Sequence, residues 1–121
     1  MRRRASQTRR SAVSELIVEF PLVRVILGHM GHGIVIYING AIDVAERNAN
    51  VYLETSGMPM HTKIKEAVDR VGPDRVLFGS DIPFHHPKVE IDRVKLAGLS
   101  PEQLERVLST NARALFLGQR G

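Results

Sequence analysis

The chain has 121 residues, of which 43% are hydrophobic and 25% are charged. This length allows one domain with a buried core, and the composition is that of an ordinary globular chain. The sequence has no cysteine, which excludes disulfide bonds and thiolate metal sites. His, Asp and Glu are left as the side-chain ligands available to a metal.

The net charge of +4 is unevenly distributed along the chain. Residues 1–10 contain five arginines and no acidic residue, which leaves residues 11–121 with a net charge of −1. We predict a basic disordered tail over 1–10, a folded domain over 11–118 and a short tail over 119–121. The arginines can bind nucleic acid or anionic lipid without specificity, so we expect no specific nucleic-acid partner and no membrane partner.

The longest apolar run, over residues 16–27, is interrupted by Glu19, Pro21 and Arg24. Two charges and a proline in so short a run make a poor membrane span. We therefore expect no transmembrane segment and a cytoplasmic protein.

Helical and extended patterns alternate along the chain. Apolar residues recur at helical spacing in some segments and form short continuous runs in others. Gly72-Pro73 ends one helix, while Ser100, Pro101 and Gln103 begin another as N-cap, first-turn proline and capping-box residue. The predicted order is helix 12–20, strand 22–27, helix 35–47, strand 50–55, helix 61–71, a strand from residue 75 that stops at Gly79-Ser80-Asp81, a loop, and a helix from Ser100 to Gly118.

This alternation predicts an α/β fold with parallel strands and crossover helices. Three strands do not close a barrel, their apolar runs need cover on both faces, and at least one sheet edge stays open. We therefore expect the chain to be part of a larger structure, and to aggregate or self-associate when alone.

Polar side chains follow each predicted strand. His29 follows the first strand, Glu54 lies at the end of the second, and Asp81 follows the third. Because the carboxyl ends of parallel strands share one sheet edge, these side chains are expected to converge there. Imidazole and carboxylate together suit zinc binding or general-base chemistry. The alternative for Asp81 is that it only organises a turn.

The glycines at positions 28, 31 and 33 also invite a dinucleotide-binding interpretation. They follow a predicted strand and precede a predicted helix. Their spacing is G-x-x-G-x-G, the reverse of the G-x-G-x-x-G that the phosphate-binding turn requires. We therefore do not adopt this interpretation.

Several motifs together resemble the closing part of the amidohydrolase-related family of metal-dependent hydrolases. They are Phe20-Pro21, the run 25–31 (VILGHMG), the run 50–57 (NVYLETSG), the run 71–83 (VGPDRVLFGSDIP) and Asn111-Ala112-Arg113. The resemblance covers about residues 12–118. It implies the C-terminal portion of a TIM-type (β/α)₈ barrel, with about strands six to eight and their helices.

The resemblance also implies roles for two residues. Asp81 matches the strand-eight aspartate, a metal ligand that takes the proton from the attacking water. His29 matches the strand-six histidine that binds or polarises the reacting group or serves as a proton carrier, and it is the second expected metal ligand. The implied cofactor is a divalent metal, most often zinc with manganese as the alternative, and the implied partner is a small-molecule substrate. The metal would generate hydroxide near neutral pH.

The chain departs from the family pattern in what it lacks. The His-x-His pair of strand one and the ligand histidine of strand five are not in this sequence. A catalytic zinc takes about three protein ligands, so the isolated chain is predicted to be inactive. A second chain that supplies the missing strands is one alternative, and a truncated, non-catalytic fragment is another.

The predicted activity is hydrolysis of a C–N or C–O bond in a small organic molecule, with decarboxylation as the alternative within the same family. His32 stands where decarboxylating relatives often place a glutamate, which weakens the decarboxylase alternative. Glu54, Ser80, His85 and His86 are the predicted substrate-binding residues. For His85 and His86 the alternative is that they are solvated loop residues. For Glu54 the alternatives are that it orients His29 or is only buried and hydrogen-bonded.

Overall fold

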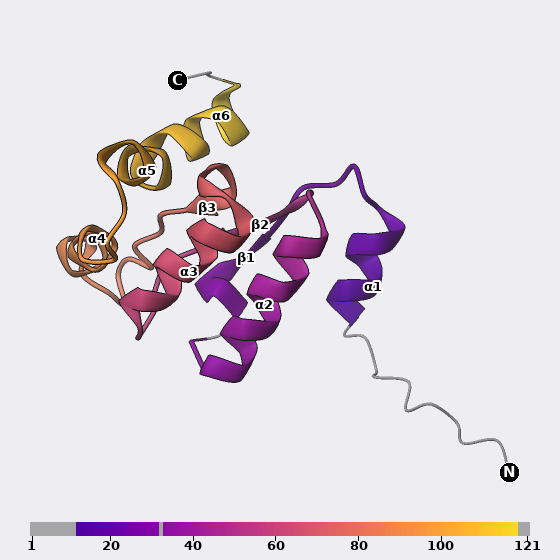
Figure 1. Cartoon of the computed structure of the whole chain (residues 1–121), viewed down its shortest axis with the longest axis horizontal. Coiled ribbons are helices and arrows are strands. Elements are labelled where there is room, and N and C mark those ends of the chain that lie inside the picture. Colours follow the sequence, from indigo (N-terminus) through magenta and orange to yellow (C-terminus); the bar gives the residue numbers. More distant parts are fainter. Residues whose placement is uncertain (1–11, 32, 119–121) are drawn as a thin grey trace, which may run out of the picture.

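The computed structural model of the chain describes residues 12–31 and 33–118. Three parallel strands form its sheet in the order β1-β2-β3. They are β1 (Val25–Leu27), β2 (Val51–Glu54) and β3 (Val76–Leu77), shown in Figure 1. The predicted α/β class and the parallel sheet are therefore confirmed. The two predicted tails, over residues 1–10 and 119–121, lie outside the described residues, and so does His32.

The helices before and between the strands agree closely with the sequence patterns. The helices predicted over 12–20, 35–47 and 61–71 are present as α1, α2 and α3, and three further helices follow β3. Within the described residues, no helix combines the length and the apolar character that crossing a bilayer requires. The helices are α1 (Ala12–Glu19), α2 (Val35–Arg47), α3 (His61–Val71), α4 (Pro87–Lys95), α5 (Pro101–Glu105) and α6 (Asn111–Leu117).

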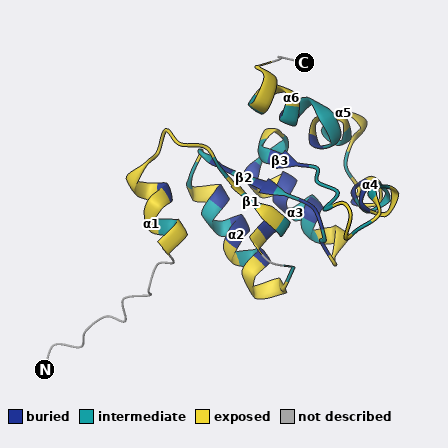
Figure 2. Cartoon of the chain, turned by 180° about the vertical axis from the view of Figure 1, so that it is seen from behind, coloured by how far each residue is buried: buried dark blue, intermediate teal, exposed yellow. Residues whose placement is uncertain are grey.

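The core lies between one face of the sheet and helices α2 and α3. Val51, Leu53 and Val76 point into it and are fully buried, because alternate residues of a strand face opposite sides of a sheet. The side chains from the helices that meet them are Ile38, Ile42, Ile64 and Val68. The opposite face carries Ile26, which is exposed, Tyr52, which is half-buried, and Leu77, which is buried. The predicted cover on both faces is therefore present on the second face at β3 and incomplete at β1 and β2 (Figure 2).

The first strand is shorter than predicted. Residues 22–24 form a turn and a bend instead of extending the strand, and Leu22 is 96% exposed. The helix α4 lies in a segment predicted to be a loop. Its buried residues are Glu90 and Val94. Because one of these two residues is charged, the spacing of apolar residues does not indicate a helix here.

The last predicted helix begins as expected. The Ser100 hydroxyl accepts from the Gln103 N–H and the Gln103 side chain accepts from the Ser100 N–H, the predicted capping box. A π-helical segment, Arg106–Thr110, interrupts the helix. There the Asn111 N–H donates to Arg106 O, and the carbonyl of Val107 accepts from the Phe78 N–H at 2.9 Å. The interruption thus coincides with a backbone link to the end of β3.

Candidate active site

His29 follows β1 in a left-handed turn. Its φ is 54° and that of the buried Met30 is 46°, an uncommon conformation for residues other than glycine. The main-chain N–H of His29 donates to Glu54 Oε2 at 3.0 Å. Its ring Nδ1 lies 2.8 Å from the carbonyl oxygen of Ser56. A carbonyl only accepts, so Nδ1 carries a proton, and in the neutral ring Nε2 keeps its lone pair.

The Ser56 hydroxyl agrees with this protonation of the His29 ring. It lies 3.1 Å from Nδ1 and 2.9 Å from Glu54 Oε2. Its single proton goes to the carboxylate, which only accepts when ionised, so the hydroxyl oxygen accepts from Nδ1. Two acceptors therefore face the same ring nitrogen.

Glu54 connects the ends of all three strands. Its oxygens accept from the main-chain N–H groups of His29 and Ser56 and from the Ser56 hydroxyl. Its carboxylate also lies against Gly79, where an added Cβ would overlap Oε1. Glu54 thus orients His29 through its main chain, and the ring itself is held by Ser56. A role of Glu54 in orienting His29 for chemistry stays a prediction.

Asp81 follows β3 in a second left-handed turn, with a φ of 52°. Its carbonyl oxygen accepts from the N–H groups of Phe84 and His85, at 2.9 and 3.2 Å. This turn brings His85 back over the Asp81 side chain, and His85 Nε2 lies 3.9 Å from Asp81 Oδ2. The Asp81 side chain is 32% exposed, so it is open to a ligand from outside.

The two neighbouring histidines have different surroundings. His85 Nδ1 lies 2.9 Å from Oε1 of the buried Glu90, so His85 is fixed to α4. His86 is exposed and its Nδ1 accepts from the Lys88 N–H at 3.1 Å, which caps the N-terminus of α4. His61, at the start of α3, is exposed.

The structure brings His29, His85 and Asp81 to one edge of the sheet. An added Cβ on Gly57 would lie 2.9 Å from Cε1 of His85 and 3.1 Å from Nδ1 of His29, so both rings pack against this glycine. Within residues 12–31 and 33–118, no group of three or more His, Asp or Glu side chains is placed to hold a metal ion. The residues that sequence reasoning missed are Glu90 and Gly57.

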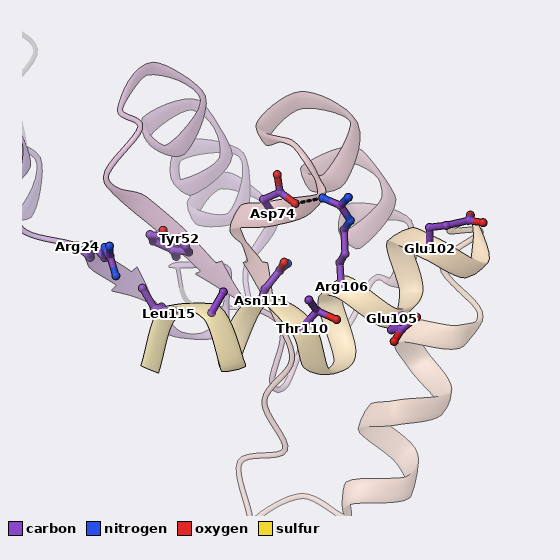
Figure 3. A pocket seen from close by; sticks show the side chains of 10 residues that line it. Arg24, Tyr52, Asp74, Glu102, Glu105, Arg106, Thr110, Asn111 and Leu115 are labelled. Atoms are coloured by element: carbon purple, nitrogen blue, oxygen red, sulfur yellow. Dashed lines mark hydrogen bonds and ion pairs between the residues drawn. The ribbon is translucent and has the colours of Figure 1, made fainter. Parts of the chain in front are cut away.

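A groove of about 640 Å³ lies elsewhere, and the sequence did not indicate it. Arg24 and Asp74, which precede β1 and β3, line it, so it opens at the amino ends of the strands (Figure 3). Arg106 forms an ion pair with Asp74 across it. Ligands of parallel α/β sheets bind at the carboxyl ends of the strands, which favours the His29 and Asp81 edge.

Comparison with known proteins identifies the family. The amidohydrolase family model matches residues 1–117, and the chain belongs to the amidohydrolase family. It is 28% identical to the γ-resorcylate decarboxylase of Rhizobium sp. (strain MTP-10005), over 88% of this chain and 38% of that protein. It is 29% identical to the γ-resorcylate decarboxylase of Rhodococcus jostii (strain RHA1), again over 88% and 38%.

Solved structures give the same result for the fold. A dihydroxybenzoic acid decarboxylase from Polaromonas sp. JS666, with bound manganese and the inhibitor 2-nitroresorcinol, aligns with a TM-score of 0.68 and 27% identity. That alignment covers 89% of this chain and 38% of that one. An uncharacterised TIM-barrel protein from Bordetella bronchiseptica aligns with a TM-score of 0.73 and 26% identity, over 88% and 39%. The chain therefore spans less than half the length of these TIM-barrel relatives.

Proposed function

We propose that this chain forms part of the active site of a metal-dependent decarboxylase that acts on hydroxylated aromatic carboxylic acids. The observation that carries the proposal is the similarity to γ-resorcylate decarboxylases along 88% of the chain. A related structure holds 2,6-dihydroxybenzoate. These relatives favour the decarboxylase alternative over the predicted hydrolysis of a C–N or C–O bond.

We further propose that β1, β2 and β3 correspond to strands six, seven and eight of the barrel. The parallel order, the crossover helices and the resemblance of the strand-end motifs support this assignment. The remaining strands would then come from further residues of the same protein or from a second chain.

The proposed metal, zinc or manganese, needs ligands from outside the described residues. Asp81 and His29 are donors of the types that both metals accept. They are two donors, whereas a catalytic metal takes about three protein ligands. The described residues by themselves do not complete a metal site, so the proposed roles concern only this chain's own groups.

Decarboxylation places a proton on the ring carbon that loses its carboxylate. The C–C bond breaks, carbon dioxide leaves, and the electron pair of that bond takes up the proton. Asp81 is the proposed proton donor, because its half-exposed carboxyl group lies at the carboxyl end of β3. His29 is the proposed acceptor of a hydrogen bond from the substrate, since its Nε2 keeps a lone pair.

The other predicted substrate-binding residues differ in position and in the hydrogen bonds that they already make. Ser80 and His85 stand next to Asp81, in sequence and in space respectively, and are proposed to line the substrate site. Glu54 and His86 already accept from main-chain N–H groups. A substrate contact from either of them would add to a structural role.

The test begins with the genomic DNA upstream of codon 1. Any coding sequence for a His-x-His strand and a later ligand histidine is joined to the chain to give an extended protein. With manganese, this protein is expected to convert 2,6-dihydroxybenzoate into resorcinol and carbon dioxide, measured by chromatography. Hydrolysis of phenyl esters or anilides without any decarboxylation would contradict the proposal.

A further inference from the structure

We infer that His85 is a third residue of the active site, and that the buried pair Glu90 and Arg93 holds its ring so that the Nε2 lone pair faces Asp81 and accepts a hydrogen bond from the Asp81 carboxyl group in its proton-donating form. The inference rests on the proposed function, because that function gives Asp81 its catalytic role. Glu90 and Arg93 are positioning residues, since they act through His85.

The first step is the burial of Glu90. Its side chain is 2% exposed, and a buried carboxylate is costly unless its oxygens are paired. Oε2 accepts from Arg93 Nη1 at 2.7 Å and from the Gly57 N–H at 3.1 Å. Oε1 faces Nδ1 of His85 at 2.9 Å. A buried acid with this set of partners fixes the position of each of them.

The second step is the state of the His85 ring. In its ion pair with Arg93, Glu90 is a carboxylate and therefore only accepts hydrogen bonds. Nδ1 of His85 must then carry the proton that it donates to Oε1. The neutral ring consequently has its lone pair on Nε2, the nitrogen on the side of Asp81.

The third step is where this nitrogen lies. Nε2 is 3.9 Å from Asp81 Oδ2, which is a contact between facing groups and not yet a direct hydrogen bond. The N–H groups of Phe84 and His85 both donate to the Asp81 carbonyl, which closes the turn that carries the ring over the carboxylate. Nε2 only accepts, so the ring holds Oδ2 in place when the Asp81 carboxyl group carries the proton that it donates.

The fourth step links this arrangement to His29. The Gly57 N–H is held by Glu90, and the rings of His29 and His85 both pack against Gly57. Glu90 thus fixes one ring directly and the glycine that separates the two rings. A helix that the sequence predicted to be loop supplies the support for the site.

The test uses the 121-residue chain with ¹⁵N-labelled histidine and requires no activity. Spectra are recorded at a pH well above the ordinary pKa of histidine, so that the rings are neutral. We expect His85 to carry its proton on Nδ1, with an observable Nδ1 proton because the acceptor is buried. A proton on Nε2 of His85 in the wild-type chain would overturn the inference, whether or not any variant folds.

Two variants extend this measurement. Glu90→Gln is expected to shift part of the His85 population to the Nε2 tautomer, whereas Asp92→Asn, on the exposed side of α4, leaves it unchanged. His85→Gln is expected to move the ¹³Cγ resonance of Asp81, whereas His61→Gln leaves it in place. A folded Glu90→Gln variant with an unchanged tautomer, or an Asp81 resonance insensitive to His85→Gln, would overturn the positioning role.

The extended protein separates this inference from the proposed function. There His85→Gln is expected to lower kcat about tenfold and leave KM within about twofold, since a mispositioned catalytic group affects the chemical step more than binding. Failure of the wild-type extended protein to release carbon dioxide would refute the function alone. The ring tautomer would still decide the role of Glu90.

Discussion

The two ends of the sheet use their polar side chains differently. At the amino ends, polar side chains donate to main-chain carbonyls: Arg75 to those of Ala45, Asn48, Val51 and Val71, and Asn111 to those of Pro73 and Val76. At the carboxyl ends, most bonds join polar side chains to one another or to nearby N–H groups, and one joins a ring to the Ser56 carbonyl. The side chains are those of Glu54, Ser56, His29, Glu90 and His85. The side chains at the amino ends therefore tie main-chain segments together, whereas those at the carboxyl ends hold one another in fixed directions at the open edge.

This difference also explains why the groove at the amino ends is not the candidate site. Its volume of about 640 Å³ would admit a small molecule. Yet Asp74 pairs with Arg106, and Asn111 is engaged with two carbonyls. These residues of the groove are engaged in the structure, whereas Asp81 and His29 are the residues proposed to carry the chemistry.

The sharpest way to break the comparison is to remove the acidic group of Asp81. In the extended protein, Asp81→Asn is expected to lower decarboxylation roughly a thousandfold, ~4 kcal/mol of transition-state stabilisation, because the amide donates no proton to carbon. Its urea midpoint is expected to stay close to that of the wild type, since the carboxylate supports no other described element. A variant that keeps most of its activity would remove Asp81 from the site.

At the amino ends the expected effect is on stability. Arg75→Met removes the donor to four carbonyl oxygens, of which Val51 O lies in β2. Burial lowers the pKa of Arg75, yet an arginine stays charged in proteins, so its bonds are charge-assisted. We expect a loss of about 3 kcal/mol in the free energy of unfolding, measured by urea denaturation.

The control for Arg75 is Arg47→Met, an exposed arginine in the last turn of α2. A surface change of this kind is expected to stay within about 0.5 kcal/mol. Equal losses for Arg47→Met and Arg75→Met would show that the carbonyl contacts contribute nothing beyond a positive charge.

Two glycines provide a matched test of the carboxyl ends. An added Cβ on Gly79 would overlap the Glu54 carboxylate, whereas one on Gly40 in α2 has open space around it. Gly79→Ala is expected to cost about 2 kcal/mol and to displace Glu54 from the His29 and Ser56 N–H groups. Gly40→Ala is expected to stabilise by about 0.5–1 kcal/mol through its helix propensity. Thermal unfolding followed by circular dichroism checks both, and a neutral Gly79→Ala would contradict the close approach.

Much of the fold could be predicted because local patterns and tertiary packing agree. The apolar runs before Gly28 and around Leu53 mark strands, of which the second has fully buried core-facing residues. The Ser100 capping box marks a helix start with its own hydrogen bonds. The helix α4 could not be predicted, because its buried positions are Glu90 and Val94. A charged residue becomes a core residue only when its partners are in place: here Arg93 in the same helix, His85 just before that helix, and the N–H of Gly57 from a distant segment.

The candidate site, like the fold, could be predicted only in part. Its location followed from the position of His29 and Asp81 at strand ends, since parallel strands bring such residues to one edge. The state of the His29 ring did not follow, because it depends on the Ser56 carbonyl, 27 residues away. The choice between hydrolysis and decarboxylation did not follow either, since both chemistries use a histidine and an aspartate at these positions.

Between the two ends lies a cluster of surface charges on α2 and α3, and the smallest expected effect concerns it. Arg70 bonds to Asp43, Glu46 and Glu66. Its hydrogen bond lowers the pKa of Asp43, and the hydrogen bond from Lys63, with a smaller contribution from Arg70, lowers that of Glu66. A carboxyl group with a lowered pKa in the folded state stabilises the fold above its unfolded pKa, and this contribution disappears as the pH falls through the folded value.

The unfolded values for these two acids are 3.8 and 4.5. Arg70→Gln is therefore expected to reduce stability slightly at pH 7, and the difference from the wild type is expected to vanish as the pH falls below these values. The effect is small because exposed ion pairs are screened by water and salt. Urea midpoints at pH 7 and at successively lower pH measure it. A deficit of Arg70→Gln that persists in acid would show that Arg70 acts through packing of its side chain and not through the two carboxylates.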